Sequence, residues 1–192
     1  GDDHLHAYDP YRTGPSEAQQ PQLDAIGHEW RGFWIAAIRE TSRKRGCCWP
    51  TTILASWSPS KEKRERFEAY RHAIHDGTLD LETLCKQEGL TLACDRVHFY
   101  NRWVTPLGRP RRFDTRFFIA EAPPQQVGLH DDKELDDSCW ITPQQALERH
   151  RAGDFDLMAV TVKQLEGLCR FDSIDALHRW AMASAAMRSI QL

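Results

Sequence analysis

The most informative part of the sequence reads Arg39-Glu40-Thr41-Ser42-Arg43-Lys44-Arg45-Gly46-Cys47. Residues three and four apart share one face of a helix, so Glu40, Arg43 and Lys44 are expected to project together near the end of a helix that closes at Gly46. A small hard cation needs several oxygen ligands, and arginine and lysine offer no acceptor atom. The stretch therefore has the spacing of a metal-binding helix, but it carries one carboxylate and two cations there.

This stretch resembles the end of the Nudix box, in which Arg-Glu is followed by two further glutamates and a glycine. Arg39, Glu40 and Gly46 match that pattern at the family's spacing, whereas Arg43 and Lys44 stand where the paired glutamates belong. The resemblance implies a magnesium site built from all three glutamates, and it implies that Arg39 holds the loop and pairs with a box glutamate. Of those three glutamates, this chain retains Glu40.

The downstream half of the chain carries further motifs in the same order as one branch of this family. They are Trp103-Val104-Thr105-Pro106, Arg112-Phe113-Asp114-Thr115-Arg116-Phe117-Phe118, Glu134, Trp140-Ile141-Thr142-Pro143 and Ala146-Leu147. Together they resemble the Nudix branch related to coenzyme A diphosphatases, over about residues 25–180. The resemblance implies an α/β fold, a Nudix-like mixed β-sheet sandwiched by helices. It also implies an activity that cleaves diphosphates of coenzyme A or of nucleosides.

The upstream part of the box departs from the family as well. Arg31 stands where the box has a glutamate, and Ala25 stands where it has a glycine. The branch also places two strands and a glycine-rich turn before the box, and little room remains for them ahead of Ala25. We therefore expect the N-terminal strands to be missing, because the chain is a fragment that begins near that turn at Gly1 or because part of one sheet has been lost.

Hydrophobic periodicity and turn residues predict the remaining elements. Prolines and a glycine among polar residues predict an irregular segment over residues 1–24, followed by one Nudix-like domain over 25–192. The predicted helices are 26–45, 59–75, 79–87, 143–151, 160–169 and 174–190, the second and third forming a helical insertion over about 59–89. The predicted strands are 97–104, 112–120 and 137–141.

Composition limits the function classes. A net charge of −3 gives no general attraction to nucleic acid or to an anionic membrane, and no apolar run is long enough to span a bilayer. The six cysteines form no Cys-x-x-Cys pair, which argues against a zinc site and a secreted disulfide framework. We therefore expect a cytoplasmic protein that binds neither nucleic acid nor membrane, and whose partner is a small-molecule diphosphate or nucleotide.

Two carboxylates are the candidate catalytic residues. Glu40 is a candidate metal ligand for Mg²⁺ or Mn²⁺. The competing interpretation is a structural pairing with Arg43, Lys44 or a neighbouring strand, which is favoured because two of the three carboxylates that attract the cation are gone. Glu134 lies before the Trp140 motif, where several Nudix enzymes keep a glutamate that acts as a base or an extra metal ligand. Its neighbours are acidic too, so a solvated acidic loop is the competing interpretation.

The candidate substrate-binding residues are the cations Arg39, Arg43, Lys44 and Arg112. Guanidinium groups match phosphate geometry, and the family resemblance suggests the same role for Arg112. A structural pairing of Arg112 with Asp114 is the alternative. The aromatic residues of the strands are expected to belong to the core.

Three functions remain open from the sequence. The first is a Nudix-fold protein that has lost metal-dependent diphosphate hydrolysis and still binds its anionic ligand. The second is an active diphosphatase with a rebuilt Mg²⁺ or Mn²⁺ site that uses Glu40 and Glu134. The third is a homodimeric interaction protein, in which a partner chain supplies the missing sheet edge.

Overall fold

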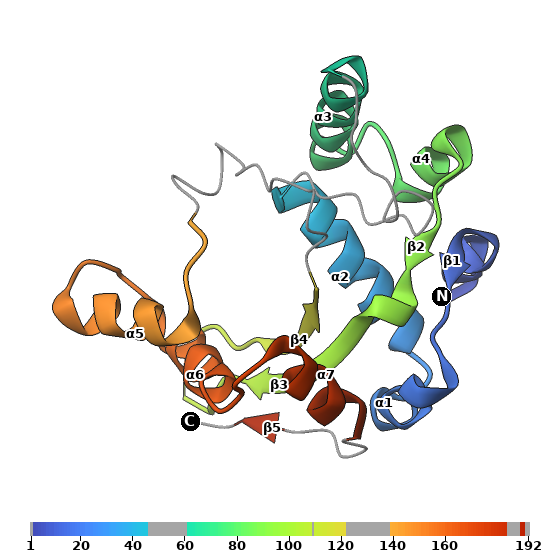
Figure 1. The fold of residues 1–192 in the computed structure, drawn as a ribbon. Helices are drawn as coiled ribbons and strands as arrows, with labels where there is room; N and C mark the ends of the chain where they lie inside the picture. Colours follow the sequence, from blue (N-terminus) through green and yellow to red (C-terminus); the bar gives the residue numbers. More distant parts are fainter. Residues whose placement is uncertain (1, 46–60, 109, 122–138, 184–188, 191–192) are drawn as a thin grey trace.

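A computed structural model describes residues 2–45, 61–108, 110–121, 139–183 and 189–190 (Figure 1). The elements of the N-terminal half are the 3-10 helix η1 (Asp2–Tyr11), β1 (Arg12–Thr13), η2 (Glu17–Gln19), α1 (Gln20–Ile26), α2 (Trp30–Arg45), α3 (Lys61–His75) and α4 (Leu81–Glu88). The C-terminal half contains β2 (Leu92–Ala93), η4 (Cys94–Arg96), β3 (Val97–Val104), β4 (Asp114–Ala120), α5 (Pro143–Ala152), α6 (Ala159–Leu168), α7 (Ile174–Ala183) and β5 (Ser189–Ile190). Within these ranges, no helix combines the length and the apolar character needed to cross a membrane.

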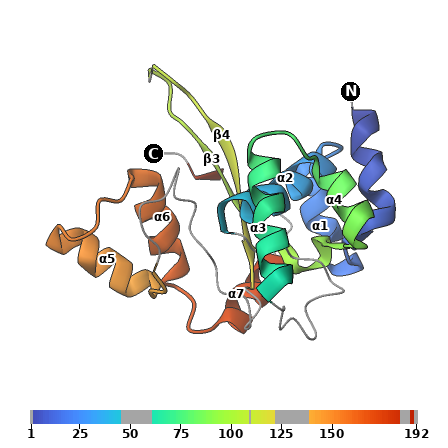
Figure 2. The ribbon, with the colours of Figure 1, turned by 90° about the horizontal axis from the view of Figure 1, so that it is seen from above.

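The β3–β4 hairpin is the centre of the fold. Its strands are antiparallel, in a register that pairs Val97 with Ala120 at one end and Val104 with Asp114 at the other. On its other edge β3 pairs in parallel with β5, and a separate small sheet joins β1 to β2 in parallel. The predicted mixed α/β architecture is confirmed. Figure 2 shows the hairpin between two groups of helices, with α1 to α4 on one side and α5 and α6 on the other.

Helix α2 is anchored to this hairpin by a large buried aromatic side chain. Trp34 is 0% exposed, and its indole nitrogen donates a hydrogen bond of 2.9 Å to the carbonyl of Val97. The ring also packs edge-on against Phe118 of β4, with centroids 4.9 Å apart. Ile38 follows one turn later and is 2% exposed, so these two apolar residues of α2 belong to the core.

The N-terminal residues carry more regular structure than the predicted irregular segment over 1–24. They form η1, β1, η2 and most of α1, and Gly27, with φ of 83°, separates α1 from α2 where one helix from residue 26 was predicted. Two buried amides explain the difference. Gln19 donates to the carbonyls of Cys94 (3.0 Å) and Val97 (2.8 Å), and Gln22 accepts from the Phe99 amide (2.8 Å). These bonds connect residues more than 70 positions apart, which local patterns do not reveal.

Two predictions in the C-terminal half are corrected. The described part of the predicted strand 137–141, from Cys139 to Ile141, has no strand pairing, and Trp140 is 82% exposed rather than part of the core. The predicted helix 174–190 ends earlier, because Ser189–Ile190 instead forms β5 along Arg102 and Trp103. An aromatic and β-branched composition favours a strand only where a partner strand is present.

Helices with strong local signals were predicted well. Thr142 caps α5 by accepting from the Gln145 amide, and the Gln145 side chain accepts from the Thr142 amide in return. Asp80 caps α4 by accepting hydrogen bonds from both the Thr83 amide and the Thr83 hydroxyl, and Gly89 ends that helix in the left-handed conformation. Capping boxes and glycine C-caps act within one helical turn, so the sequence is sufficient to locate them.

One buried histidine gives a testable pH dependence. His98 of β3 is buried with its ring centroid 5.2 Å from that of His178 on α7. Burial lowers the pKa of His98 and His178 lowers it further, while Asp95 opposes the shift. The unfolded chain therefore binds this proton more tightly, and stability is lost as the pH falls below the ordinary histidine pKa of about 6.5.

We expect His98→Phe to flatten the dependence of Tm on pH between about pH 7 and pH 5, because the proton uptake that favours unfolding is removed. Differential scanning fluorimetry across that range measures the slope. An unchanged slope in the variant would show that another group causes the acid sensitivity.

Candidate functional site

The C-terminal end of α2 carries the residues singled out by the sequence. Arg39 and Glu40 are partly exposed there, at 54% and 43% of their side chains, and their closest charged atoms, Arg39 Nε and Glu40 Oε1, lie 3.9 Å apart. The two charges are neighbours, but exposed pairs of this kind hold each other weakly. Both side chains therefore remain accessible to a charged ligand.

Helix α2 continues without interruption to Arg45, so positions 43 and 44 are helical. They lie three and four residues after Glu40, and residues at these distances share one face of a helix. The predicted juxtaposition of one carboxylate with two basic residues therefore has the backbone geometry it requires.

The described residues at this end of α2 do not form a ligand set that fits a divalent cation. No group of three or more histidine, cysteine, aspartate or glutamate side chains in the described parts of the chain is placed to hold a metal ion. Mg²⁺ requires near-octahedral oxygen ligands, and Glu40 supplies one carboxylate beside Arg39. Glu134, the second predicted carboxylate, lies outside the described residues. Its role as a base or metal ligand stays a prediction.

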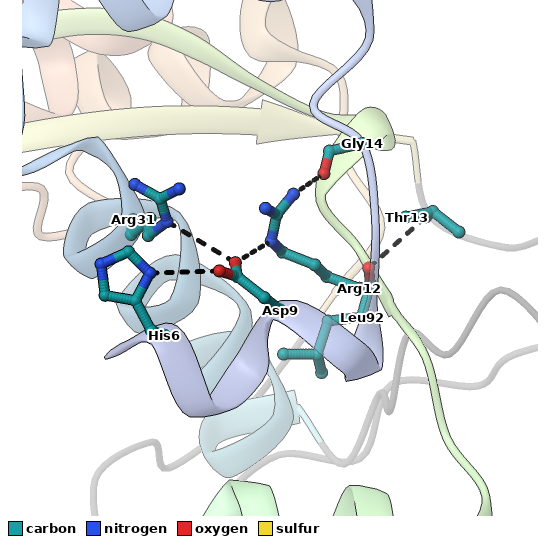
Figure 3. A network of polar contacts seen from close by, with 7 residues as sticks. All are labelled: His6, Asp9, Arg12, Thr13, Gly14, Arg31 and Leu92. Carbon is teal, nitrogen blue, oxygen red and sulfur yellow. Dashed lines mark hydrogen bonds and ion pairs between the residues drawn. The ribbon is translucent and has the colours of Figure 1, made fainter. Parts of the chain in front are cut away.

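Arg31, at a position where the Nudix box has a glutamate, belongs to a polar network with η1 (Figure 3). Asp9 accepts a hydrogen bond of 2.7 Å from Arg12 Nε, lies 3.1 Å from His6 Nδ1, and has Arg31 Nε at 3.6 Å. Partial burial raises the pKa of Asp9, but the bonds from Arg12 and His6 outweigh it and the pKa lies below its ordinary range.

Arg12 and Arg31 also lie over the ring of Trp30. The guanidinium of Arg31 lies 4.6 Å from the Trp30 ring centroid and that of Arg12 lies 5.4 Å from it. Arg31 therefore has a structural task, which is to fix the start of α2 against the N-terminal segment. This network could not be predicted from the sequence, because Asp9 belongs to no recognisable motif and its partners lie in different elements.

The network continues into β1. Arg12 also donates to the carbonyl of Gly14, and the Thr13 hydroxyl donates to the carbonyl of Leu92 at 3.4 Å (Figure 3). Gly14 has φ of 67°, and a Cβ at this position would lie 2.7 Å from the Cβ of Asp95. Glycine is needed here for both the backbone conformation and the close approach.

Arg112, the predicted substrate-binding arginine of the second motif, lies at the turn of the β3–β4 hairpin. It precedes β4, and its Nε donates a hydrogen bond of 3.0 Å to the carbonyl of Thr105 in the same hairpin. Figure 2 shows this turn extending away from α2. The structure therefore does not bring Arg112 together with Arg39 and Glu40, and its role in substrate binding remains a prediction.

The alternative prediction, a structural pairing of Arg112 with Asp114, is wrong. Asp114 instead accepts two hydrogen bonds of 2.6 Å from Arg102 on the neighbouring strand, and it lies 3.2 Å from Arg116. The bond from Arg102 holds the pKa of Asp114 below its ordinary range. The cross-strand register places Asp114 opposite Val104, diagonal to Arg102, which long side chains bridge easily.

Comparison with known proteins identifies the family and the fold of this chain. Residues 9–171 match the family model described as the NUDT19 Nudix domain. The chain belongs to this Nudix family. A Nudix hydrolase from Alicyclobacillus acidocaldarius has the same fold, with a TM-score of 0.63 and 22% identity, over 91% of this chain and 78% of that one.

Curated Nudix relatives are similar at low identity. Acyl-coenzyme A diphosphatase NUDT19 is 25% identical over 169 residues in Gallus gallus and 26% identical over 164 residues in Homo sapiens, covering 78% and 80% of this chain. Putative nudix hydrolase 7 from Caenorhabditis elegans is 24% identical over 163 residues, covering 81% of it. The chain spans less than half the length of these relatives, at 43%, 43% and 49%. The predicted family and its coenzyme A diphosphatase branch are confirmed.

Proposed function

We propose that this Nudix domain binds an anionic diphosphate, a coenzyme A or nucleoside-diphosphate derivative, at the C-terminal end of α2 and that its metal-dependent hydrolysis is impaired. The observation that supports the proposal is the unbroken helix through Arg45, because residues three and four positions after Glu40 share a helix face with it. The names of the relatives support the ligand class. The charge reversal at two box positions supports the loss of hydrolysis.

Binding and hydrolysis make different demands on this end of the helix. Arg39, Arg43 and Lys44 supply positive charge, which attracts a diphosphate and can donate charge-assisted hydrogen bonds to its oxygens. Hydrolysis by the family's chemistry needs carboxylates that hold a divalent metal ion. The positively charged arginine and lysine side chains repel such an ion. The same substitutions therefore favour binding and disfavour turnover.

We expect wild-type protein to bind coenzyme A, ADP-ribose or NAD, and Arg43→Gln/Lys44→Gln to weaken that binding about tenfold, since two attractive charges are removed. Isothermal titration calorimetry measures both affinities, and the difference should shrink at high salt. Lys61→Gln/Lys86→Gln is the matched control, because it removes two exposed cations from α3 and α4. Equal affinities in wild type and the Arg43/Lys44 variant would place the ligand elsewhere. Absence of binding to all three compounds would contradict the proposal.

A further inference from the structure

One edge of the central sheet is open within the part of the chain that the structure describes. The strand order is β4, β3, β5, so among the described residues β4 is hydrogen-bonded to β3 on one side and to no strand on the other. Figure 2 shows the β3–β4 hairpin extending beyond the helices on both sides, with its turn at the far end. An open edge presents backbone N–H and C=O groups that can pair with a strand of another molecule.

The hydrogen bonds at the turn end of the hairpin show which residues of β4 direct their backbone groups outward. The Phe113 amide donates to Thr105 Oγ1 at 3.0 Å, and the Phe113 carbonyl accepts from the Thr105 amide at 2.9 Å. In an antiparallel ladder, residues that bond to the neighbouring strand alternate with residues that do not. The register continues regularly from here, so Asp114 and Arg116 direct their N–H and C=O groups to the open edge.

The charges of these two residues are self-complementary. If a second β4 pairs antiparallel about a two-fold axis at Thr115, Asp114 of each copy lies opposite Arg116 of the other. Opposite charges directly across such a pair stabilise it, and like charges destabilise it. An axis at Arg116 or at Asp114 places that residue against its own copy, and an axis at Phe117 forms no charge pair. The charge pattern therefore selects the axis at Thr115.

The carboxylate of Asp114 is able to accept a further bond. Its side chain is 40% exposed, and it accepts two hydrogen bonds of 2.6 Å from Arg102. An ionised carboxylate has about four acceptor positions, so acceptor capacity remains. The guanidinium of Arg116 lies 3.2 Å from this carboxylate, which places it on the face where the Asp114 of a second copy arrives.

The opposite face of β4 adds apolar contact. Arg116 lies 4.2 Å from the ring centroid of Phe33 on α2, so the alternating residues Phe113, Thr115 and Phe117 share the face away from α2. Phe113 is 63% exposed, and with Thr115 it lines an apolar cavity of about 550 Å³ beside the start of α6. About an axis at Thr115, Phe113 of one copy lies opposite Phe117 of the other. Aromatic pairs of this kind stabilise paired strands.

We propose that two copies of this chain associate by antiparallel pairing of their β4 edges about a two-fold axis at Thr115. The pairing joins the two sheets into one and uses the same residues of each copy, as a closed two-fold interface requires. It satisfies the backbone groups of the open edge, two charge pairs and the exposed ring of Phe113. The inference is independent of the proposed ligand site, because no residue from the C-terminal end of α2 contributes to the interface.

The first test measures molar mass by size-exclusion chromatography with light scattering over a series of protein concentrations. We expect the wild-type mass to rise toward that of two chains. Asp114→Arg sets arginine against Arg116, and Arg116→Asp sets aspartate against Asp114. Each variant alone is therefore expected to weaken dimerisation at least about tenfold. An equal mixture of the two variants should dimerise again, because each copy supplies the charges that the other lacks.

The matched controls are Asp175→Arg and Arg179→Asp, which make the same charge changes at exposed positions of α7 and should leave dimerisation unchanged. A wild-type protein that keeps the mass of one chain up to millimolar concentration would overturn the proposal. Undiminished dimerisation of either β4 variant would also overturn it. So would a mixture that stays monomeric although both variants keep the circular dichroism spectrum of the wild type.

A second variant tests the axis without changing any charge. Thr115→Cys places two thiols across the axis, where opposite Cα atoms of an antiparallel pair lie about 4.5 Å apart, within reach of a disulfide. On mild oxidation we expect a covalent dimer in far higher yield than in Leu107→Cys, an exposed position at the hairpin turn. Oxidised wild type measures the cross-linking by the native cysteines. Equal yields in the two cysteine variants would place the axis elsewhere and overturn the proposal.

Discussion

Replacing Arg43 and Lys44 together by glutamate is expected to raise the affinity of this chain for Mn²⁺ on the order of 100-fold. The two substitutions remove two cations beside Glu40 and add two carboxylates at the i+3 and i+4 positions of the same helix. Three carboxylates on one helix face then offer the oxygen ligands that a hard cation requires. Titration of Mn²⁺ followed by electron paramagnetic resonance, which detects the free ion, measures the change.

The control for this gain of metal binding is Lys61→Glu/Lys86→Glu. It makes the same change in net charge at exposed positions of α3 and α4, so it reports the effect of a more acidic protein without a new ligand set. We expect its Mn²⁺ affinity to stay close to that of wild type. Equal gains in both variants would mean that general charge, and not the helix face of Glu40, governs the metal affinity.

Trp34→Ala is expected to lower the free energy of unfolding by about 4 kcal/mol, since it removes a fully buried indole and leaves a cavity. The variant also leaves the Val97 carbonyl without the indole hydrogen bond. This loss is a large part of the about 5–15 kcal/mol that stabilises a typical domain. Urea unfolding followed by circular dichroism measures it.

Trp140→Ala provides the matched comparison. Trp140 is 82% exposed, so the same substitution should change the free energy of unfolding by no more than about 0.5 kcal/mol. A loss of several kcal/mol at Trp140, or a small loss at Trp34, would contradict the assignment of the core to the α2–hairpin interface.

The sequence predicted the features that local chemistry determines. The cap of α5 at Thr142 acts within one turn, and β3 is rich in aromatic and β-branched residues. The cap of α4 at Asp80 was not predicted, because the helix was expected to begin at residue 79. The helix that carries Glu40 was also predicted, and it continues to Arg45 as expected.

The features that the sequence missed depend on distant partners. Gln22 bonds to Phe99 and Ala181, so no local pattern predicts that a polar N-terminal segment packs onto the sheet. Asp114 pairs with Arg102 and not with Arg112, because the strand register brings Arg102 within hydrogen-bonding distance. The hydrogen bond between Asn101 and Gln164 likewise joins β3 to α6, and no local pattern predicts it.

The proposed function separates two properties that the family normally combines, which are attraction of an anionic ligand and metal-assisted cleavage. In the proposed function, Arg39, Arg43 and Lys44 serve the first property, and the absence of the paired glutamates prevents the second. A domain of this kind would report or retain a diphosphate ligand without consuming it.

The most direct measurement is a titration of Mg²⁺ and Mn²⁺ into wild-type protein while product release from coenzyme A, ADP-ribose and NAD is followed, with Glu40→Gln as the control. We expect no metal-dependent turnover at millimolar metal in either protein. Turnover that rises with metal in the wild type and vanishes in Glu40→Gln would mean that the chain holds a working metal site and would contradict the account.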